Sequence, residues 1–224
     1  MTSVDLDYLK KAAALKASEF VRSGMVVGLG TGSTAKHLLV ALGEQVKAGM
    51  KLRGVPTSQE TAVLAKQAGI PLIDAENRWE IDVAIDGADQ VDPHFNLIKG
   101  GGGALLKEKI VAASAKQFIV MVDHTKQVPV LGGSFPLPIE VIPFGWGSTA
   151  REIEGLTKSR VVLRERNGAP FRTEAGNLIV DVHIDRISQP GELETALNLI
   201  PGVVETGLFV GRTHVLIVGA PQGV

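Results

Sequence analysis

Short apolar runs alternate with amphipathic stretches along the first half of the chain. Five runs rich in Val and Ile have the length of buried strands, at residues 25–30, 51–56, 70–73, 81–86 and 117–123. The stretches STAKHLLVALGEQVKAG and SQETAVLAKQAG repeat apolar residues at helical spacing between these runs. Strands that alternate with helices form parallel sheets with helices on both faces. The first half therefore predicts a mostly parallel, doubly wound, Rossmann-like sheet.

The pattern changes after Asp123. Residues 128–144 are rich in Pro and Gly, which favours a domain boundary or a crossover. Residues 160–185 read as antiparallel strands, with hairpin-turn signals at Asn167–Gly168 and at 175–177. This part of the chain therefore predicts antiparallel strands.

The end of the chain offers one more helix and one more strand. The helix is expected within 189–203, with Pro190 near its start, and the strand within 213–221. That strand can return to the first sheet, which would make the first domain discontinuous. We expect an α/β domain of residues 1–130 plus 207–224 and a smaller α+β domain of residues 131–206.

Composition removes several classes of function. A net charge of −1 over 224 residues provides no basic field for nucleic acid or an acidic membrane surface. The absence of cysteine excludes disulfides, thiolate catalysis and cysteine-ligated metals. The amphipathic, acid-containing N-terminus does not resemble a signal peptide, and no apolar run approaches the roughly 20 residues that span a bilayer. We expect a cytoplasmic protein without nucleic-acid or membrane partners.

The loop GLGTGSTA, residues 28–35, lies between a predicted strand and a predicted helix. Its glycines permit a tight turn, and Thr31, Ser33 and Thr34 offer hydroxyls and a helix N-cap. Ser33 replaces the third glycine of a dinucleotide fingerprint, and no G-K-[ST] sequence marks a Walker A loop. A tight turn without a ligand is one interpretation. We favour the binding of a small anion, without NAD.

The loop IDGADQVDP, residues 85–93, places Asp86 at the carboxyl end of a predicted strand. The spacing of Asp86, Asp89 and Asp92 does not match an EF-hand, and no histidine or glutamate ligand pattern accompanies it, so no metal site is predicted. Asp92 before Pro93 reads as a turn residue. Asp86 and Asp89 are either turn formers or groups that bond sugar hydroxyls or move protons.

The loop KGGGGALLKEKI, residues 99–110, runs from a lysine through four glycines into a helix. On a helical wheel, Glu108 lies among small apolar residues, where lost hydration would raise its pKa and make it a competent base. A solvated glutamate in a surface KEK run is the alternative. Lys99 could face a developing oxyanion or a phosphate. Ligands of open α/β sheets sit beyond the carboxyl ends of the strands, where all three loops fall.

These three loops, in this order, closely resemble ribose-5-phosphate isomerase of the A type. DHTKQV, FPLPIEVIP, GN-LIVDV and IPGVVETGLF extend the resemblance over nearly the whole chain. The resemblance implies an enzyme without metal or cofactor that interconverts D-ribose 5-phosphate and D-ribulose 5-phosphate in the non-oxidative pentose phosphate pathway. It also implies an α/β domain with a smaller α+β domain, and a homo-oligomer, either a dimer or a tetramer.

The resemblance further assigns roles to residues. Glu108 corresponds to the proton-transferring base, Asp86 to its acid–base partner and Lys99 to an electrostatic stabiliser. The implied substrate-binding set is Thr31, Gly32, Ser33, Thr34, Asp86, Gly87, Ala88, Asp89, Lys99, Gly100, Gly101, Gly102 and Lys126. The chain departs from the family at Gln90, where glutamate is usual. It also departs at the start of the helix that carries Glu108, which reads G-G-A-L-L-K-E where many members have an extra Ala and Thr or Arg.

Two other functions fit related folds. A sugar-phosphate-sensing domain would bind the same ligand without converting it, although the chain has no spare segment or basic helix for a helix-turn-helix. An acyl-CoA transferase would use a glutamate as a nucleophile, and a test of coenzyme A binding would separate that case.

Overall fold

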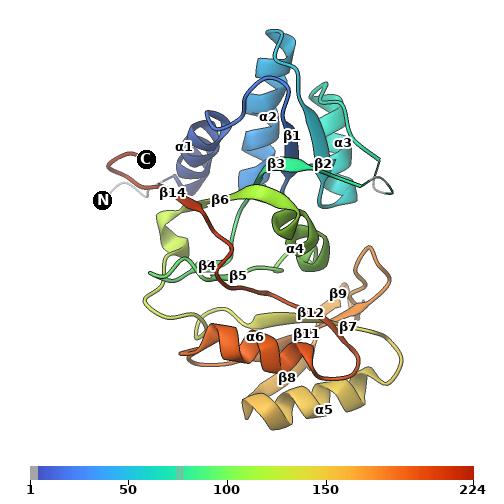
Figure 1. The fold of residues 1–224 in the computed structure, drawn as a ribbon. Helices are drawn as coiled ribbons and strands as arrows, with labels where there is room; N and C mark the ends of the chain where they lie inside the picture. The colour runs from blue at the N-terminus through green and yellow to red at the C-terminus, as the bar shows by residue number, and fades with distance from the viewer. Residues whose placement is uncertain (1–4, 75, 77) are drawn as a thin grey trace. The chain divides into compact units, whose positions relative to one another are not determined.

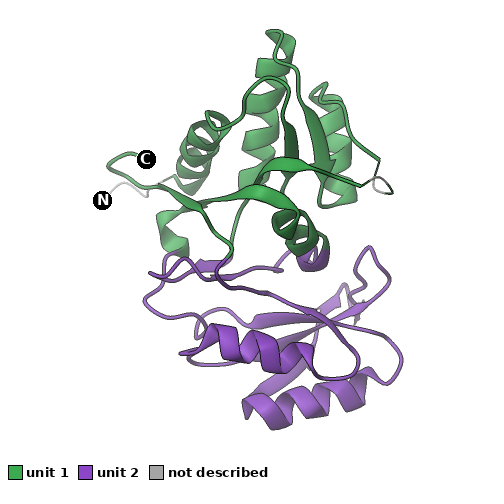
Figure 2. Cartoon of the chain, viewed as in Figure 1, with its two compact units in different colours: residues 1–88, 107–126, 212–224 green, residues 89–106, 127–211 purple. Residues whose placement is uncertain are grey.

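The structure is a computed structural model, and it describes residues 5–74, 76 and 78–224. It divides into two compact units, coloured separately in Figure 2. Unit 1 comprises Met1–Ala88, Lys107–Lys126 and Arg212–Val224, and unit 2 comprises Asp89–Leu106 and Gln127–Gly211. Within the described residues, no helix is both long and apolar enough to cross a membrane.

Unit 1 is built on a five-stranded sheet in the order β14-β6-β3-β1-β2, in which every neighbouring pair is parallel (Figure 1). Its strands are β1 (Val26–Leu29), β2 (Arg53–Pro56), β3 (Ile81–Asp86), β6 (Ala115–Asp123) and β14 (Val215–Gly219). The predicted parallel sheet is confirmed, and the last strand does return to it.

Helices cover both faces of this sheet. They are α1 (Leu6–Ser18), α2 (Ser33–Lys47), α3 (Gln59–Gln67) and α4 (Leu105–Ala113). Leu38 of α2 packs in one core with Val27 and Ile85 of the strands. Gly28 lies between Val27 and Leu29 of β1, so it faces the opposite side of the sheet. A Cβ at Gly28 would collide there with Val111 of α4. A glycine is therefore needed for α4 to approach β1 this closely.

The predicted strand at 70–73 is wrong. Leu72 forms only an isolated parallel bridge with Gly54, made by Gly54 N–H to Pro71 O (2.8 Å) and Ile73 N–H to Gly54 O (2.9 Å). Pro71 has no N–H to donate, so the ladder beside β2 does not extend.

Unit 2 contains a four-stranded antiparallel sheet in the order β12-β7-β11-β8. The strands are β7 (Leu137–Val141), β8 (Arg160–Leu163), β11 (Leu178–His183) and β12 (Val203–Thr206), and the helices are α5 (Trp146–Thr157) and α6 (Pro190–Asn198). Ile139, Ile153 and Leu197 share the core of this unit with Val180. The predicted smaller α+β fold is confirmed.

Two smaller sheets complete unit 2. The hairpin of β9 (Glu165–Arg166) and β10 (Ala169–Pro170) turns at Asn167 and Gly168, which both have positive φ (56° and 76°). The predicted hairpin is therefore confirmed, with the two positive φ angles that a type I′ turn requires. The other sheet joins β4 (Gln90–Val91), β5 (Leu97–Ile98) and β13 (Leu208–Phe209) in the order β13-β5-β4.

The boundaries expected from the sequence, 1–130 with 207–224 and 131–206, stay a prediction. The compact units divide the chain differently, because residues 89–106 bond to the later part of unit 2. β5 pairs with β13, and the Gln90 side-chain amide donates to Gly132 O (2.8 Å).

Candidate active site

The carboxyl ends of the strands in unit 1 carry several of the residues singled out from the sequence. Thr31 follows β1, Asp86 ends β3, and the short helix η1 (His124–Lys126) follows β6. Strands of a parallel sheet end at one edge, so these groups gather where open α/β folds bind ligands.

Asp86 is held in a fixed orientation. Its side chain is buried (3% exposed), and its Oδ1 accepts hydrogen bonds from Thr31 N–H (3.1 Å) and Gly87 N–H (2.7 Å). A Cβ on Gly30 would collide with the carboxylate and lie 2.7 Å from Asp86 Cα. The glycine before Thr31 therefore leaves the space that this carboxylate occupies.

Replacing Gly30 with Ala is expected to lower stability by about 1–3 kcal/mol, the usual cost of overpacking, and to lower turnover by displacing Asp86. Chemical denaturation and steady-state rates would measure both effects. Gly147→Ala is the matched control, because a Cβ at Gly147 meets nothing within 4 Å among the residues that the structure describes. Wild-type stability and turnover in Gly30→Ala would contradict the fixed position of Asp86.

The sequence suggested that Thr31 could cap a helix, but its hydroxyl does not do so. It bonds instead to Thr57 Oγ1 (2.8 Å), Ser58 Oγ (2.8 Å) and Thr61 Oγ1 (3.2 Å), and Gly32 is the N-cap of α2 without a side-chain cap bond. Sequence reasoning missed this hydroxyl cluster. The signal was Thr57–Ser58 at the end of β2, where Ser58 caps α3 through Thr61 N–H (3.1 Å).

The remaining hydroxyls of the first loop differ in exposure. Ser33 is exposed and Thr34 is buried (9% exposed), both in the first turn of α2. The N-cap, Gly32, has no side chain to cap this turn, whose backbone N–H groups are oriented as in helix N-termini that bind anions.

Glu108 lies in the first turn of α4 and is buried (6% exposed). Lys107 beside it is exposed, whereas Lys109 is buried (4% exposed). The interpretation of Glu108 as a solvated residue of a surface KEK run is therefore wrong. A carboxylate removed from bulk water is suited to proton transfer.

Lys126 ends the short helix η1. Asp123 Oδ1 accepts hydrogen bonds from Thr125 N–H (3.0 Å) and from the Thr125 hydroxyl, which fixes the turn. Lys126 is partly exposed at the carboxyl end of β6. It is thus placed to meet an anionic group at this edge.

In unit 2, Lys99 follows β5 and is buried (3% exposed). Its N–H donates to Gly207 O (2.8 Å), and its Nζ lies 5.5 Å from the centre of the Phe209 ring. An ammonium at that distance from an aromatic face is stabilised by cation–π attraction.

Asp89 also belongs to unit 2, and one of its oxygens is engaged by the glycine loop. Asp89 Oδ2 accepts a hydrogen bond from Gly101 N–H (2.8 Å). The carbonyls of Gly100 and Gly101 accept from Arg164, a residue that the sequence had not singled out. No motif marks this arginine, because it lies more than 60 residues from the loop.

Asp92 is the turn residue expected from the sequence. Its Oδ1 accepts hydrogen bonds from His94 N–H and Asn96 N–H, both at 2.9 Å. Among the described residues, no group of three or more His, Cys, Asp or Glu side chains could hold a metal ion.

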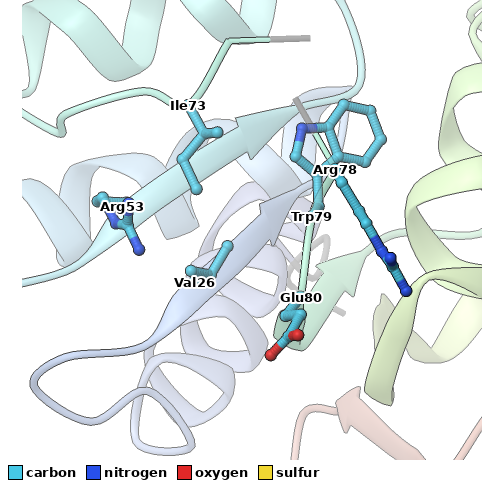
Figure 3. Close-up of a pocket in the computed structure, with 6 residues that line it drawn as sticks. All are labelled: Val26, Arg53, Ile73, Arg78, Trp79 and Glu80. Carbon is cyan, nitrogen blue, oxygen red and sulfur yellow. The ribbon is translucent and has the colours of Figure 1, made fainter. Parts of the chain in front are cut away.

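A pocket of about 520 Å³ opens at the opposite, amino ends of the strands in unit 1 (Figure 3). It is lined by Val26, Arg53, Ile73, Arg78, Trp79 and Glu80. Arg53, Arg78 and Glu80 are exposed, and none of the predicted site residues lines the pocket. We therefore assign no substrate to it.

An ion pair near these strand ends is structural. Asp82 Oδ1 accepts from Lys116 Nζ (2.8 Å), and its Oδ2 accepts from Val26 N–H (2.9 Å). The hydrogen bond from Lys116 lowers the pKa of Asp82, and the same bond raises the pKa of Lys116. The pair links β1, β3 and β6 at the surface.

Comparison with known proteins shows the family of the chain. The sequence model of ribose 5-phosphate isomerase A (phosphoriboisomerase A) matches residues 53–223. Ribose-5-phosphate isomerase A of Bradyrhizobium diazoefficiens is 48% identical, over 99% of this chain and 95% of its own length. That of Parvibaculum lavamentivorans is 50% identical, over 98% of this chain and 97% of its own.

Solved structures show the same similarity. Ribose 5-phosphate isomerase from Plasmodium falciparum superposes with a TM-score of 0.94 at 37% identity, covering 97% of this chain and 96% of its own. A D-ribose-5-phosphate isomerase in complex with phospho-erythronic acid superposes with a TM-score of 0.94 at 42% identity, covering 98% of this chain and 97% of its own. The chain belongs to the ribose-5-phosphate isomerase A family and is an isomerase.

Proposed function

We propose that this isomerase interconverts D-ribose 5-phosphate and D-ribulose 5-phosphate through an enediolate. The observation that carries the proposal is the buried carboxylate of Glu108 in a chain of this family (6% exposed). Glu108 takes the proton from C2 of the open-chain aldose, and the electron pair of that C–H bond forms the C1–C2 double bond. The electron pair of the C1=O bond moves onto O1, which takes up a proton, and the C2 hydroxyl loses its proton. Return of the proton from Glu108 to C1 then leaves a carbonyl at C2, so the ketose forms without an oxidant.

Two further groups serve the sugar oxygens. Lys99 stabilises the enediolate oxygen, since a preorganised cation in a dry site lowers the energy of a developing oxyanion. Asp86, fixed by two backbone N–H donors, moves protons at the sugar oxygens and assists ring opening. Asp89 has a second oxygen with which to accept from a sugar hydroxyl.

The first turn of α2 and Lys126 are the groups suited to the substrate's anionic end. The loop from Thr31 to Thr34 ends in a helix start without a side-chain cap, an arrangement that favours phosphate. The phospho-erythronic acid bound by a relative supports a site for phosphorylated sugar acids. The carboxylate of such an acid resembles an enediolate in its two planar oxygens. A homo-oligomeric state and a cytoplasmic location stay predictions.

Conversion of D-ribose 5-phosphate by the wild-type chain, with a metal chelator present, tests the proposal. We expect the ketose to accumulate to equilibrium at the same rate with and without chelator. Binding of the phosphosugar without conversion would instead support a sensing domain and contradict the proposed function. Loss of activity with chelator would contradict metal independence.

A further inference from the structure

We infer that Arg164 and Asp181 are positioning residues that fix the peptide between Gly101 and Gly102, so that Gly102 N–H can donate to the phosphosugar. The inference deepens the proposed function and rests on it. Neither Arg164 nor Asp181 belongs to the set of residues implied by the family's motifs.

Arg164 is itself rigidly held. It follows β8, and Asp181 lies on β11, which pairs with β8. Arg164 Nε donates to Asp181 Oδ2 (2.8 Å), and its Nη2 donates to Asp181 Oδ1. The two side chains are mostly buried (14% and 17% exposed). A planar guanidinium bound in this bidentate way has a fixed direction, which a lysine could not provide.

The remaining nitrogen of Arg164 holds the glycine loop. Arg164 Nη1 donates to Gly100 O (2.7 Å) and to Gly101 O (3.2 Å). On the opposite side of the Gly100–Gly101 peptide, Gly101 N–H donates to Asp89 Oδ2 (2.8 Å). That peptide is therefore held at both its oxygen and its hydrogen.

The next peptide is held at its oxygen alone. A trans peptide is planar, with the C=O and N–H pointing in opposite directions. Arg164 holds Gly101 O and thereby sets the direction of Gly102 N–H. Gly102 is exposed, nothing lies within 4 Å of the position its Cβ would take, and its N–H donates no hydrogen bond within the described part of the chain. The donor is thus oriented, accessible and open to a ligand oxygen.

The loop needs such an anchor because of its sequence. Fixing a backbone in one conformation costs conformational entropy, and glycine loses the most freedom. Four glycines in a row would sample many conformations without external contacts. Gly100 also has a positive φ (107°), which only glycine adopts at low cost. The Arg164–Asp181 pair supplies an anchor from β8 and β11, outside the loop.

Arg164→Gln, Arg164→Lys and Asp181→Asn test the inference through three readouts. These are the KM for D-ribose 5-phosphate, the inhibition constant of phospho-erythronic acid and the melting temperature. We expect KM and the inhibition constant to rise together by about ten-fold or more, since charged hydrogen bonds that orient a donor contribute at this level. We expect kcat to change less. Arg172→Gln is the matched control, because Arg172 Nη1 donates to the carbonyl of Gly176 in another turn of unit 2 (3.0 Å).

A structural role alone would lower the melting temperature and leave KM and the inhibition constant of the folded enzyme unchanged, and that result would overturn the inference. If Arg164→Gln does not fold, Arg164→Lys and the isosteric Asp181→Asn test the inference instead, through KM and the inhibition constant of phospho-erythronic acid. If wild type binds phospho-erythronic acid but does not isomerise the sugar, the proposed function fails. Binding of this acid to the variants still tests the anchor.

The amide signal of Gly102 gives a second test. In wild type labelled with ¹⁵N, we expect this signal to move on addition of phospho-erythronic acid. In Arg164→Gln the change should be smaller and require more ligand. A Gly102 signal that does not respond in wild type would overturn the donor role.

Discussion

Glu108→Gln is expected to lower kcat for the conversion of D-ribose 5-phosphate by about 10²–10⁴-fold, the usual contribution of a positioned base. The amide has the shape of the carboxylic acid and keeps the packing of a buried position (6% exposed). It cannot accept the proton from C2, so the step fails while the sugar still binds. We expect the inhibition constant of phospho-erythronic acid to stay close to the wild-type value.

Glu60→Gln is the matched control for this variant. Glu60 lies in the first turn of α3, as Glu108 does in the first turn of α4, but it is exposed and pairs with Lys36 (2.8 Å). Its replacement should leave kcat unchanged. Exchange of solvent deuterium into C2 of the sugar would add a direct measure of proton removal. A folded Glu108→Gln enzyme with near-normal turnover would exclude Glu108 as the base.

The elements that the sequence predicted well are those whose pattern is local. The strand ending at Asp86 and the helix from Ser33 to Lys47 follow from alternation, helical spacing and flanking glycines. β7 was hidden in the Pro- and Gly-rich stretch 128–144, where Pro138 lies inside the strand. α5 was not predicted, because Gly145 and Gly147 flank Trp146 and such glycines are typical of a turn. Both form because their apolar residues fill the core of unit 2, which is a tertiary effect.

The same limit applies to the candidate site. Three loops were found because each concentrates glycines, hydroxyls or carboxylates in a few consecutive residues. The hydroxyl cluster joins Thr31 to Thr57, Ser58 and Thr61, and the anchor joins Arg164 to the glycine loop, so both are assembled from distant segments. In the sequence, Arg164 is one of several charged residues near a predicted hairpin turn. Only the pairing of β8 with β11 in the folded chain brings it to Asp181. Side chains that act by orienting a backbone leave no local signal in a single sequence.

Lys99→Met is expected to lower kcat by about 10²–10³-fold, the cost of removing one oxyanion-stabilising group. Lys99 is buried (3% exposed), with its Nζ 5.5 Å from the centre of the Phe209 ring. Methionine keeps the unbranched, apolar stem and can pack against the ring, so we expect the fold to be retained. A charge that acts mainly on the enediolate contributes to kcat more than to KM, because the ground-state sugar lacks the developing negative charge.

Lys126→Met separates this role from phosphate binding. Lys126 is partly exposed at the carboxyl end of β6, where a cation would act on a phosphate that carries the same charge throughout the reaction. Its replacement should therefore raise KM and the inhibition constant of phospho-erythronic acid together, with a smaller change in kcat. Both constants should fall toward wild-type values at low ionic strength if the remaining attraction is electrostatic. The opposite assignment, with KM raised by Lys99→Met and kcat lowered by Lys126→Met, would place the phosphate at Lys99 and the oxyanion at Lys126.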